Sequence, residues 1–319
     1  MPKFARWSIG SCVATMLILF GSCRSPTQPG QSPIGEDAGR PVIYTVNYPL
    51  AYFAERIGGD HVRVVFPVPP GVDPAFWRPE GEVIRGYQTA DLILLNGASF
   101  AQWAEHMALP RRRMVITARA FADRYIEIQD RVVHQHGPHG EHAHEGFAVT
   151  TWLDPQLALQ QAEAIRDELT ERWPEHSSAF HAGWETLHDD WMELDERLTA
   201  IHTAYQDQPL LASHPVYQYL ERRYRWNLVS MHWEPDEMPE AGDWEDLQEI
   251  LEDHPAGWMI WEAEPLPEIR QRLSEMGIDS VVFEPCSNVP ESGDLLSTMH
   301  ANVKQLQRIM VGEPASSAP

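Results

Sequence analysis

The chain has 319 residues, and 47 acidic against 24 basic side chains give it a formal net charge of −23 at pH 7. This excess of negative charge argues against nucleic acid and against an anionic membrane surface as electrostatic partners, and it is compatible with attracting cations. Of the three cysteines, Cys12 and Cys23 lie in the N-terminal segment and only Cys286 lies in the body, so no disulfide framework is available. A body of about 270 residues therefore relies on its hydrophobic core and is long enough for one or two domains.

The N-terminus has the pattern of an export signal. Lys3 and Arg6 precede an apolar run over 7–20, which is shorter than the roughly 20 residues that a membrane-spanning helix needs. Two small residues stand directly before Cys23 and resemble the lipobox of bacterial lipoproteins, in which the cysteine is lipidated. Phe20 departs from that motif, where leucine is more usual, so a plain signal peptide cleaved nearby is the alternative. We predict an exported protein, anchored through Cys23 in the membrane and facing the periplasm or the cell exterior.

The segment that follows is rich in serine, proline, glycine and glutamine. This composition is typical of a flexible linker, because it offers few side chains that a core could bury. We therefore divide the first part of the chain into a signal peptide over 1–23 and a tether over 24–41. The folded body starts near Pro41.

Apolar runs and helical periodicity alternate along the first half of the body. Strands are expected over 42–46, 62–68, 91–95 and 114–117, and helices over 50–57, 80–90 and 155–173. The last of these helices has Asp154 at the N-cap and Pro155 at its first position, where both residue types are favoured. Such alternation predicts a mostly parallel sheet covered on both faces. We assign it to an N-terminal α/β lobe over 42–178.

A histidine-rich stretch, VVHQHGPHGEHAHEG, covers residues 132–146 of this lobe. Its five histidines are His134, His136, His139, His142 and His144. The stretch is polar and contains glycine, so it cannot bury enough apolar surface to offset the entropy of ordering it, and we predict a mobile surface loop. Imidazoles at this density are ligands for zinc, copper or nickel. The alternative is a solvated loop that binds metal only adventitiously.

The most regular segment of the chain lies over 179–205. Its apolar residues alternate steps of four and three: Phe180, Trp184, Leu187, Trp191, Leu194, Leu198 and Ile201. This spacing makes one stripe on a helix that is close to 40 Å long at ~1.5 Å per residue. We predict a rigid linker helix packed across two lobes. A two-chain coiled coil is the alternative, but the run covers only about three heptads and lacks an ordered pattern of flanking charges.

Alternating strands and helices return after this helix. Strands are expected over 209–213, 227–231, 257–261 and 280–283, and helices over 216–224, 244–254, 267–276 and 294–310. We assign them to a C-terminal α/β lobe over 206–312. The predicted fold is therefore α/β, with two lobes of mostly parallel sheets joined by one long rigid helix.

Several stretches of the body resemble one known family in both order and spacing. They are YPLAYFAERIGGDHV (48–62), VPPGVDP (68–74), TADLILLNGASFAQW (89–103), TWLDPQLA (151–158), SHPVYQYLERRY (213–224) and VVFEP (281–285). Together with a lipobox-like N-terminus, they resemble the zinc and manganese receptors of bacterial ATP-binding-cassette (ABC) importers. A histidine-rich loop just before the W-L-D-P stretch is similar to the zinc members of that family.

The resemblance implies a metal site, which can be carried over residue by residue. The family usually supplies a histidine after the first Asp-Pro, a second two residues before the tryptophan of W-L-D-P, a third before the first helix of the second lobe, and a carboxylate near the C-terminus. His214 and Glu284 match the last two positions. Ala75 and Thr150 stand where the first two histidines are expected. The resemblance therefore predicts a site with half of its usual ligands replaced.

Two ligands do not complete a zinc site, because zinc takes four donors. The spare donors in the sequence are the loop histidines, His232 and its neighbour Glu234. Both His214 and Glu284 follow predicted strands, and open α/β sheets bind ligands in the crevice beyond the carboxyl ends of their strands. We therefore predict that His214 and Glu284 form one site.

The function that these features favour is the extracytoplasmic solute-binding component of an ABC importer. We expect it to be a monomer that binds zinc, or a related divalent transition metal, between its lobes and delivers the ion to a membrane permease. Zinc is favoured over manganese because the loop is rich in imidazole. Two alternatives stay open: the same fold with another ligand stacked on Trp77 or Trp152, and a zinc chaperone or structural lipoprotein that uses only the histidine-rich loop.

We predict that the chain is not an enzyme. It has no HExxH, no GxSxG and no glycine-rich phosphate loop, and these are the motifs that a metalloprotease, a serine hydrolase or a nucleotide-binding enzyme would carry. A zinc hydrolase needs three protein ligands around an open position beside a general base, and no closely spaced set in the sequence supplies them.

Overall fold

The computed structural model describes residues 39–128, 133–135, 141–143, 146–204 and 207–311. The predicted signal peptide with Cys23, nearly all of the tether, and the loop residues His136, His139 and His144 lie outside the described residues. Within the described residues, no helix has the length and apolar character needed to cross a membrane.

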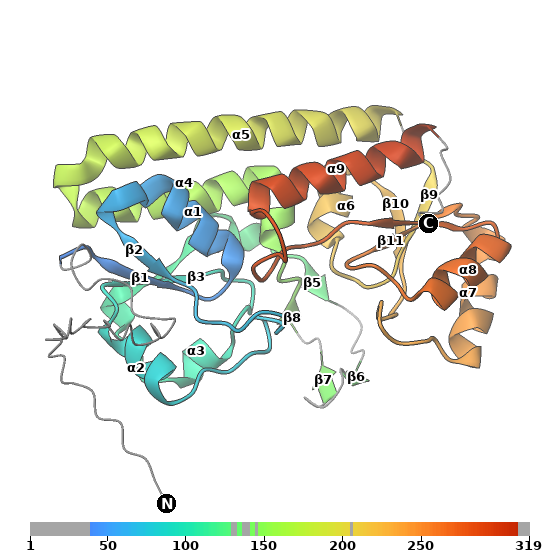
Figure 1. The fold of residues 1–319 in the computed structure, drawn as a ribbon, viewed down its shortest axis with the longest axis horizontal. Coiled ribbons are helices and arrows are strands. Elements are labelled where there is room, and N and C mark those ends of the chain that lie inside the picture. The colour runs from blue at the N-terminus through green and yellow to red at the C-terminus, as the bar shows by residue number, and fades with distance from the viewer. Residues whose placement is uncertain (1–38, 129–132, 136–140, 144–145, 205–206, 312–319) are drawn as a thin grey trace, which may run out of the picture. The chain divides into compact units, whose positions relative to one another are not determined.

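The first sheet has four parallel strands in the order β2-β1-β3-β4. They are β1 (Val42–Thr45), β2 (Arg63–Val65), β3 (Leu92–Leu95) and β4 (Met114–Ile116). Helix α1 (Tyr48–Gly58) covers one face, and α2 (Gly81–Thr89) and α3 (Trp103–His106) cover the other (Figure 1). Every residue of β3 is buried, because a central parallel strand is covered on both sides.

The second sheet repeats this architecture with the strand order β10-β9-β11-β12. Its parallel strands are β9 (Pro209–Ala212), β10 (Asn227–Ser230), β11 (Trp258–Trp261) and β12 (Asp279–Val282). Its helices are α6 (Gln218–Tyr224), α7 (Ala241–Asp253), α8 (Pro267–Glu275) and α9 (Leu295–Val311). The predicted α/β class with two mostly parallel sheets is confirmed.

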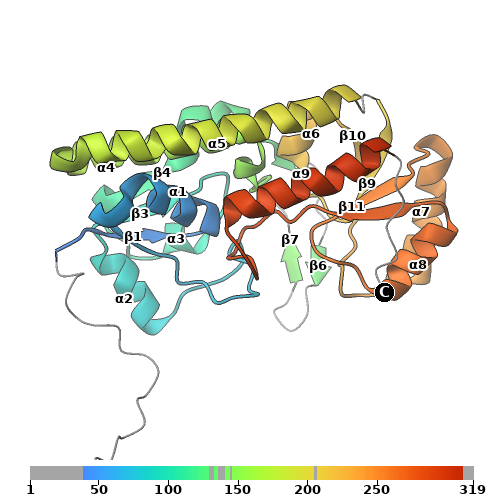
Figure 2. The ribbon, with the colours of Figure 1, turned by 45° about the horizontal axis from the view of Figure 1, so that its top comes forward.

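Two long helices follow the first sheet. Helix α4 (Pro155–Arg172) begins as predicted, with the Asp154 carboxylate accepting hydrogen bonds from the backbone N–H groups of Gln156 and Leu157 at 2.9 and 3.4 Å. Helix α5 (Ser177–Ala204) contacts α1, α4, α6 and α9 (Figure 2). The predicted helix across two lobes is therefore confirmed. Six of the seven residues of its apolar stripe are buried within its own chain and Trp184 is partly buried, so the stripe is used in the core and does not support the coiled-coil alternative.

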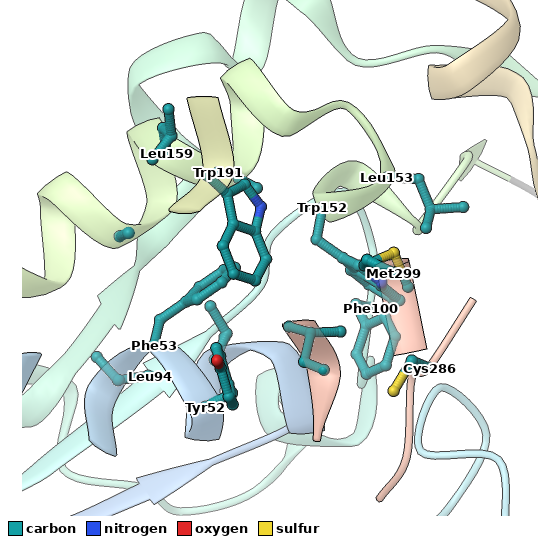
Figure 3. Close-up of a cluster of buried hydrophobic side chains, with 14 of the residues drawn as sticks. Tyr52, Phe53, Leu94, Phe100, Trp152, Leu153, Leu159, Trp191, Cys286 and Met299 are labelled. Carbon is teal, nitrogen blue, oxygen red and sulfur yellow. The ribbon is translucent and has the colours of Figure 1, made fainter. Parts of the chain in front are cut away.

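The two sheets share one continuous core around the aromatic side chains of α5 and the segment before α4. The rings of Trp191 and Phe53 meet edge to face with centroids 5.2 Å apart. Trp152 is 3% exposed and its indole N–H donates to the carbonyl oxygen of Pro285 at 2.8 Å. Figure 3 shows Met299 and Cys286 beside Trp152, so residues from both halves of the chain build this cluster. Trp152 is therefore not available to stack on a ligand.

A buried carboxylate connects three helices near this core. Asp195 of α5 accepts hydrogen bonds from Arg223 Nε at 2.9 Å, from the Tyr224 hydroxyl at 2.6 Å and from Gln156 Nε2 at 3.0 Å. The pKa of Asp195 is lowered, because these donors outweigh the opposing effect of burial. The network therefore ties the linker helix to α4 on one side and to α6 on the other.

Several short elements were not predicted from the sequence. Two antiparallel pairs flank and interrupt the histidine-rich stretch: β5 (Glu127–Ile128) with β8 (Gly146–Phe147), and β6 (Val133–Gln135) with β7 (Glu141–Ala143). Single-turn 3₁₀ elements are η1 (Gly59–His61), η2 (Arg111–Arg113), η5 (Thr151–Leu153) and η6 (Pro174–His176), and a longer one is η3 (Thr117–Arg124). The histidine-rich stretch is therefore partly a hairpin, because backbone pairing between its ends needs no apolar side chains.

Candidate metal centre

Three side chains capable of holding a metal converge at one edge of the second sheet. His214, Glu234 and Glu262 each offer a ligand atom, and these atoms all lie within 4.8 Å of one another. In the described part of the chain, no other group of three or more such residues meets this condition. We refer to His214, Glu234 and Glu262 as the triad.

The strand order explains why these three residues meet. His214, Glu234 and Glu262 follow β9, β10 and β11, and β9 lies between the other two strands. Parallel strands end at the same edge of a sheet, and neighbouring strands are about 4.8 Å apart. Backbone bonds extend the pairing beyond the strands, because Ser213 N–H donates to Ile260 and its carbonyl accepts from Trp233, at 2.8 and 2.7 Å.

The direction of the three side chains follows from strand alternation. Trp233 and Trp261, which directly precede the two glutamates, lie in the apolar cluster that the second sheet forms with α7 and α8. Successive residues of an extended chain point to opposite faces, so Glu234 and Glu262 point away from that cluster. Ala212, two residues before His214, packs on the same opposite face, in the larger core. All three donors therefore project from one face of the sheet.

The triad is largely shielded from water. His214 is 5% exposed, and Glu234 and Glu262 are partly buried. The Nδ1 atom of His214 lies 3.4 Å from a carboxylate oxygen of Glu234. A neutral imidazole and two carboxylates supply one nitrogen and at least two oxygen donors, and these are ligands that divalent transition metals accept. The residues present therefore fit a divalent metal, with coordination positions left for water or another donor.

The electrostatics of the triad favour a bound cation. The pKa of Glu262 is raised to about 8, first by burial and then by the negative charges of Glu234 and Asp73. Asp73 belongs to the Asp-Pro stretch of the first lobe, so both lobes contribute negative potential here. A divalent cation would relieve the repulsion among these carboxylates.

The raised pKa makes a prediction for the stability of the metal-free protein. Because folding raises the pKa of Glu262 from 4.5 to about 8, the folded state holds this proton more tightly, and stability is lost as pH rises through that interval. In the presence of a chelator, we expect the Glu262→Gln protein and the wild type to have the same melting temperature near pH 4. Near pH 8.5, the melting temperature of the variant should be a few degrees higher than that of the wild type. Thermal unfolding at both values tests this, with the more exposed Glu264→Gln as control. If the melting temperatures of Glu262→Gln and the wild type differed by the same amount at both pH values, this prediction would be wrong.

The structure groups only one residue of the sequence-predicted pair with other potential metal ligands. His214 lies in the triad, but Glu284 does not. Glu284 follows β12, and β11 separates β12 from β9, so two strand spacings of about 4.8 Å each lie between them. The backbone N–H and carbonyl of Glu284 bond to the side chain of Asn302 at 3.0 and 2.8 Å. Burial and the charge of Glu291 raise the pKa of Glu284.

The remaining predicted ligands lie around the triad or outside the described side chains. His232 is exposed, and its ring centroid is 5.8 Å from that of His214. It precedes Glu234 by two residues, so it stands on the same face of the chain. His134 and His142 occupy paired backbone positions of β6 and β7. His136, His139 and His144 are outside the described residues.

The two positions at which the resemblance expects histidine have other roles here. The Thr150 hydroxyl donates to the carbonyl oxygen of Val216, in the second lobe, at 2.6 Å. The Ala75 backbone N–H donates to the carboxylate of Asp73 at 2.8 Å. A hydrogen bond between lobes thus stands at one of the replaced ligand positions.

Sequence reasoning missed Glu262 as a candidate and noted Glu234 only as a spare donor. Glu262 stands directly after an all-buried strand, Trp258–Trp261, and a carboxylate at the carboxyl end of a buried parallel strand is a signal for a ligand site. That signal was present in the sequence. The sequence did not show which strands lie next to one another in the sheet.

Comparisons with known proteins agree with the fold and with a metal site. The family model described as "ZnuA: Zinc-uptake complex component A periplasmic" matches residues 43–309. The zinc-binding lipoprotein AdcA of Streptococcus pneumoniae is 23% identical over 282 residues, which are 85% of this chain and 56% of that protein. The manganese-binding lipoprotein MntA of Halalkalibacterium halodurans is 22% identical over 182 residues, 56% of each protein. The chain thus spans little more than half the length of these relatives.

A solved structure shows the same fold. The Zn(II)-bound ZnuA-like domain of Streptococcus pneumoniae AdcA superposes with a TM-score of 0.70 at 20% identity, over 85% of this chain and 98% of that domain. YcdH of Bacillus subtilis, a metal-dependent lipoprotein, superposes with a TM-score of 0.71 at 18% identity, over 84% and 98%. With the family model covering the body from the first strand to the last helix, the chain belongs to the ZnuA family, the periplasmic A components of zinc-uptake complexes.

Proposed function

We propose that this chain is the extracytoplasmic receptor of an ABC importer, and that it captures zinc or a related divalent metal at His214, Glu234 and Glu262 and delivers it to a membrane permease. The observation that carries the proposal is the triad itself, whose three ligand atoms lie within 4.8 Å of one another. Membership of the zinc-uptake family and relatives named as zinc- and manganese-binding lipoproteins support it.

The location and the assembly state belong to the same proposal. The sequence pattern before Cys23 supports export and a lipid anchor, and the relatives AdcA and MntA are named lipoproteins. Burial of the α5 stripe inside its own chain supports a monomer. We infer that the receptor works without catalysis, since its relatives are named for binding metal.

One alternative depends on the histidine-rich loop, which would bind zinc alone while the triad stays idle. The composition of the triad argues against this, because two partly buried carboxylates beside a buried histidine are costly unless a proton or a cation neutralises their charge. The second alternative is a different ligand that stacks on an indole ring. Trp152 cannot serve in this way, because its ring is buried and its N–H donates to the carbonyl oxygen of Pro285. Trp77 is then the remaining aromatic partner for such a ligand.

Metal retention tests the function directly. We expect residues 24–319, purified and dialysed, to retain zinc in preference to manganese, and zinc to raise the melting temperature of the chelator-stripped protein, because a ligand that binds only the folded state stabilises it. Deleting 134–144 should lower the number of bound zinc ions and leave the tightest site intact. A stripped protein with no thermal shift in zinc would overturn the proposal. Loss of all tight binding in the deletion variant would show that the tightest site needs the loop, either because the loop replaces the ligands missing at Ala75 and Thr150 or because it binds zinc alone.

A further inference from the structure

One hydrogen bond joins the first lobe to the turn 214–216, which carries His214. Thr150 is 5% exposed, and its hydroxyl donates to the carbonyl oxygen of Val216 at 2.6 Å. Val216 lies only two residues after His214. We propose that Thr150 is a positioning residue, which holds the backbone of His214 in place for the metal. This inference rests on the proposed function, since it concerns the ion at the triad.

Each of the three carbonyl oxygens of the turn accepts a hydrogen bond. The Val216 N–H donates to the carbonyl of His214 at 2.9 Å, and Gln218 Nε2 donates to that of Pro215 at 2.6 Å. These two donors belong to the turn itself and to the first residue of α6. The donor to the third carbonyl, that of Val216, is Thr150 of the other lobe. The first lobe therefore fixes the end of a turn whose other bonds are local.

The two residues after Thr150 anchor it firmly. The hydroxyl of Thr151 bonds to Gln161 Oε1 at 3.1 Å, and both of these side chains are fully buried in the first lobe. The indole N–H of Trp152 donates to the carbonyl oxygen of Pro285, in the second lobe, at 2.8 Å. A donor that is anchored on a rigid element restrains the group that it contacts, because it does not follow the movements of that group.

Metal binding is sensitive to small movements of this turn. The imidazole of His214 has to meet the carboxylates of Glu234 and Glu262 at one ion, and the three residues follow separate strands. Zinc–nitrogen bonds have a narrow length range of about 2.0–2.1 Å. The ring itself has other neighbours, among them Glu234 and His232, but Thr150 acts on the backbone that carries the ring. Loss of its bond should therefore weaken binding although no ligand is removed.

The test compares Thr150→Val, which keeps the shape of the side chain and loses the hydroxyl, with Thr150→Ser, which keeps the hydroxyl. The zinc dissociation constant, measured by competition with a chromogenic chelator, should rise about tenfold in Thr150→Val and stay within about threefold of the wild type in Thr150→Ser. Co²⁺ is the second probe, because its visible absorption reports the geometry of its ligands. The Co²⁺ spectrum should change in Thr150→Val and be kept in Thr150→Ser.

The matched control is Thr151→Val. Thr151 is also a buried threonine whose hydroxyl has a hydrogen-bond partner, but that partner, Gln161, belongs to the first lobe. Both valine variants should lower the melting temperature of the metal-free protein, because each leaves a polar group without its bond. Only Thr150→Val should change the zinc affinity and the Co²⁺ spectrum. A role of Thr150 in stability alone would make the two variants alike.

The metal-free protein gives a measurement that does not depend on the proposed function. The imidazole NMR signals of His214, assigned by their loss in His214→Ala, should shift in Thr150→Val and keep their wild-type positions in Thr151→Val. Equal zinc affinities and equal His214 signals in the two valine variants would overturn the inference and leave the function standing. A Thr150→Ser protein that binds zinc as weakly as Thr150→Val would also overturn it. A wild type that binds neither Zn²⁺ nor Co²⁺ would instead contradict the function, and the NMR signals would still decide whether Thr150 positions His214.

Discussion

Replacing His214 by alanine should weaken the tightest zinc site by about 100-fold or more, because the triad then loses its one nitrogen donor and keeps two carboxylates that repel each other. Glu262→Gln should cause a loss of similar size. In the proposed site His214 and Glu262 would hold the same ion, so the double variant should be little weaker than either single variant, as expected for coupled neighbours. Competition titration against a chromogenic chelator measures the zinc dissociation constant of all three variants.

Glu284→Ala is the control that decides between two models of this site. The family resemblance pairs Glu284 with His214, whereas the structure places Glu262 and Glu234 beside His214 and leaves Glu284 outside the triad. We expect Glu284→Ala to keep zinc affinity within about threefold of the wild type, because its carboxylate is not one of the converging donors. If Glu284→Ala lost as much affinity as His214→Ala and Glu262→Gln lost none, the triad model would be wrong.

The pH dependence of zinc binding should follow the same residues. Protons compete with the metal for the imidazole nitrogen of His214 and for the carboxylate of Glu262, whose pKa is about 8 in the metal-free protein. Affinity should therefore rise with pH and level off above about pH 8. In Glu262→Gln the rise in zinc affinity between about pH 7 and pH 8 should be smaller than in the wild type, because the carboxyl group that titrates there is gone.

Replacing Asp195 by alanine should lower the free energy of unfolding by about 2–4 kcal/mol, the second large effect that we expect. The substitution removes the acceptor shared by Arg223, Tyr224 and Gln156. The buried Tyr224 hydroxyl then loses its bond, and the Arg223 guanidinium, whose side chain is 27% exposed, loses the nearer of its two carboxylate partners and keeps Asp154 at 3.5 Å. Because the pKa of Asp195 is lowered in the folded state, its contribution should be present above about pH 4 and fade as pH falls further.

Urea unfolding at pH 7 measures this change, with Glu82→Ala as the control. Glu82 pairs with Arg85 on α2, but its side chain is 93% exposed, so its removal should cost at most about 0.5 kcal/mol. An Asp195→Ala protein as stable as Glu82→Ala would show that the network does not hold the three helices together. Asp195→Asn keeps the shape of the side chain and should lose less stability than the alanine variant.

The local sequence determined the long helices and the strands of the two main sheets to within a few residues, but not the short elements around them. The four-three spacing of apolar residues predicted the helix that the structure places at Ser177–Ala204, and Asp154 with Pro155 marked the start of α4. These signals are local, because a helix repeats every 3.6 residues and its cap is made by neighbours in the chain. The expected strand over 62–68 is shorter, Arg63–Val65, since pairing with β1 rather than apolar character decides where a strand ends.

The site was decided by contacts that no local pattern contains. The sequence placed His214 and Glu284 at strand ends, and the structure agrees that both follow strands. The order β10-β9-β11-β12 then set Glu234 and Glu262, rather than Glu284, beside His214. Strand order is set by which apolar faces and crossover helices pack best over the whole sheet. The apolar pattern of a strand is local and does not name its neighbours, so only the tertiary structure decides which carboxylates meet the histidine.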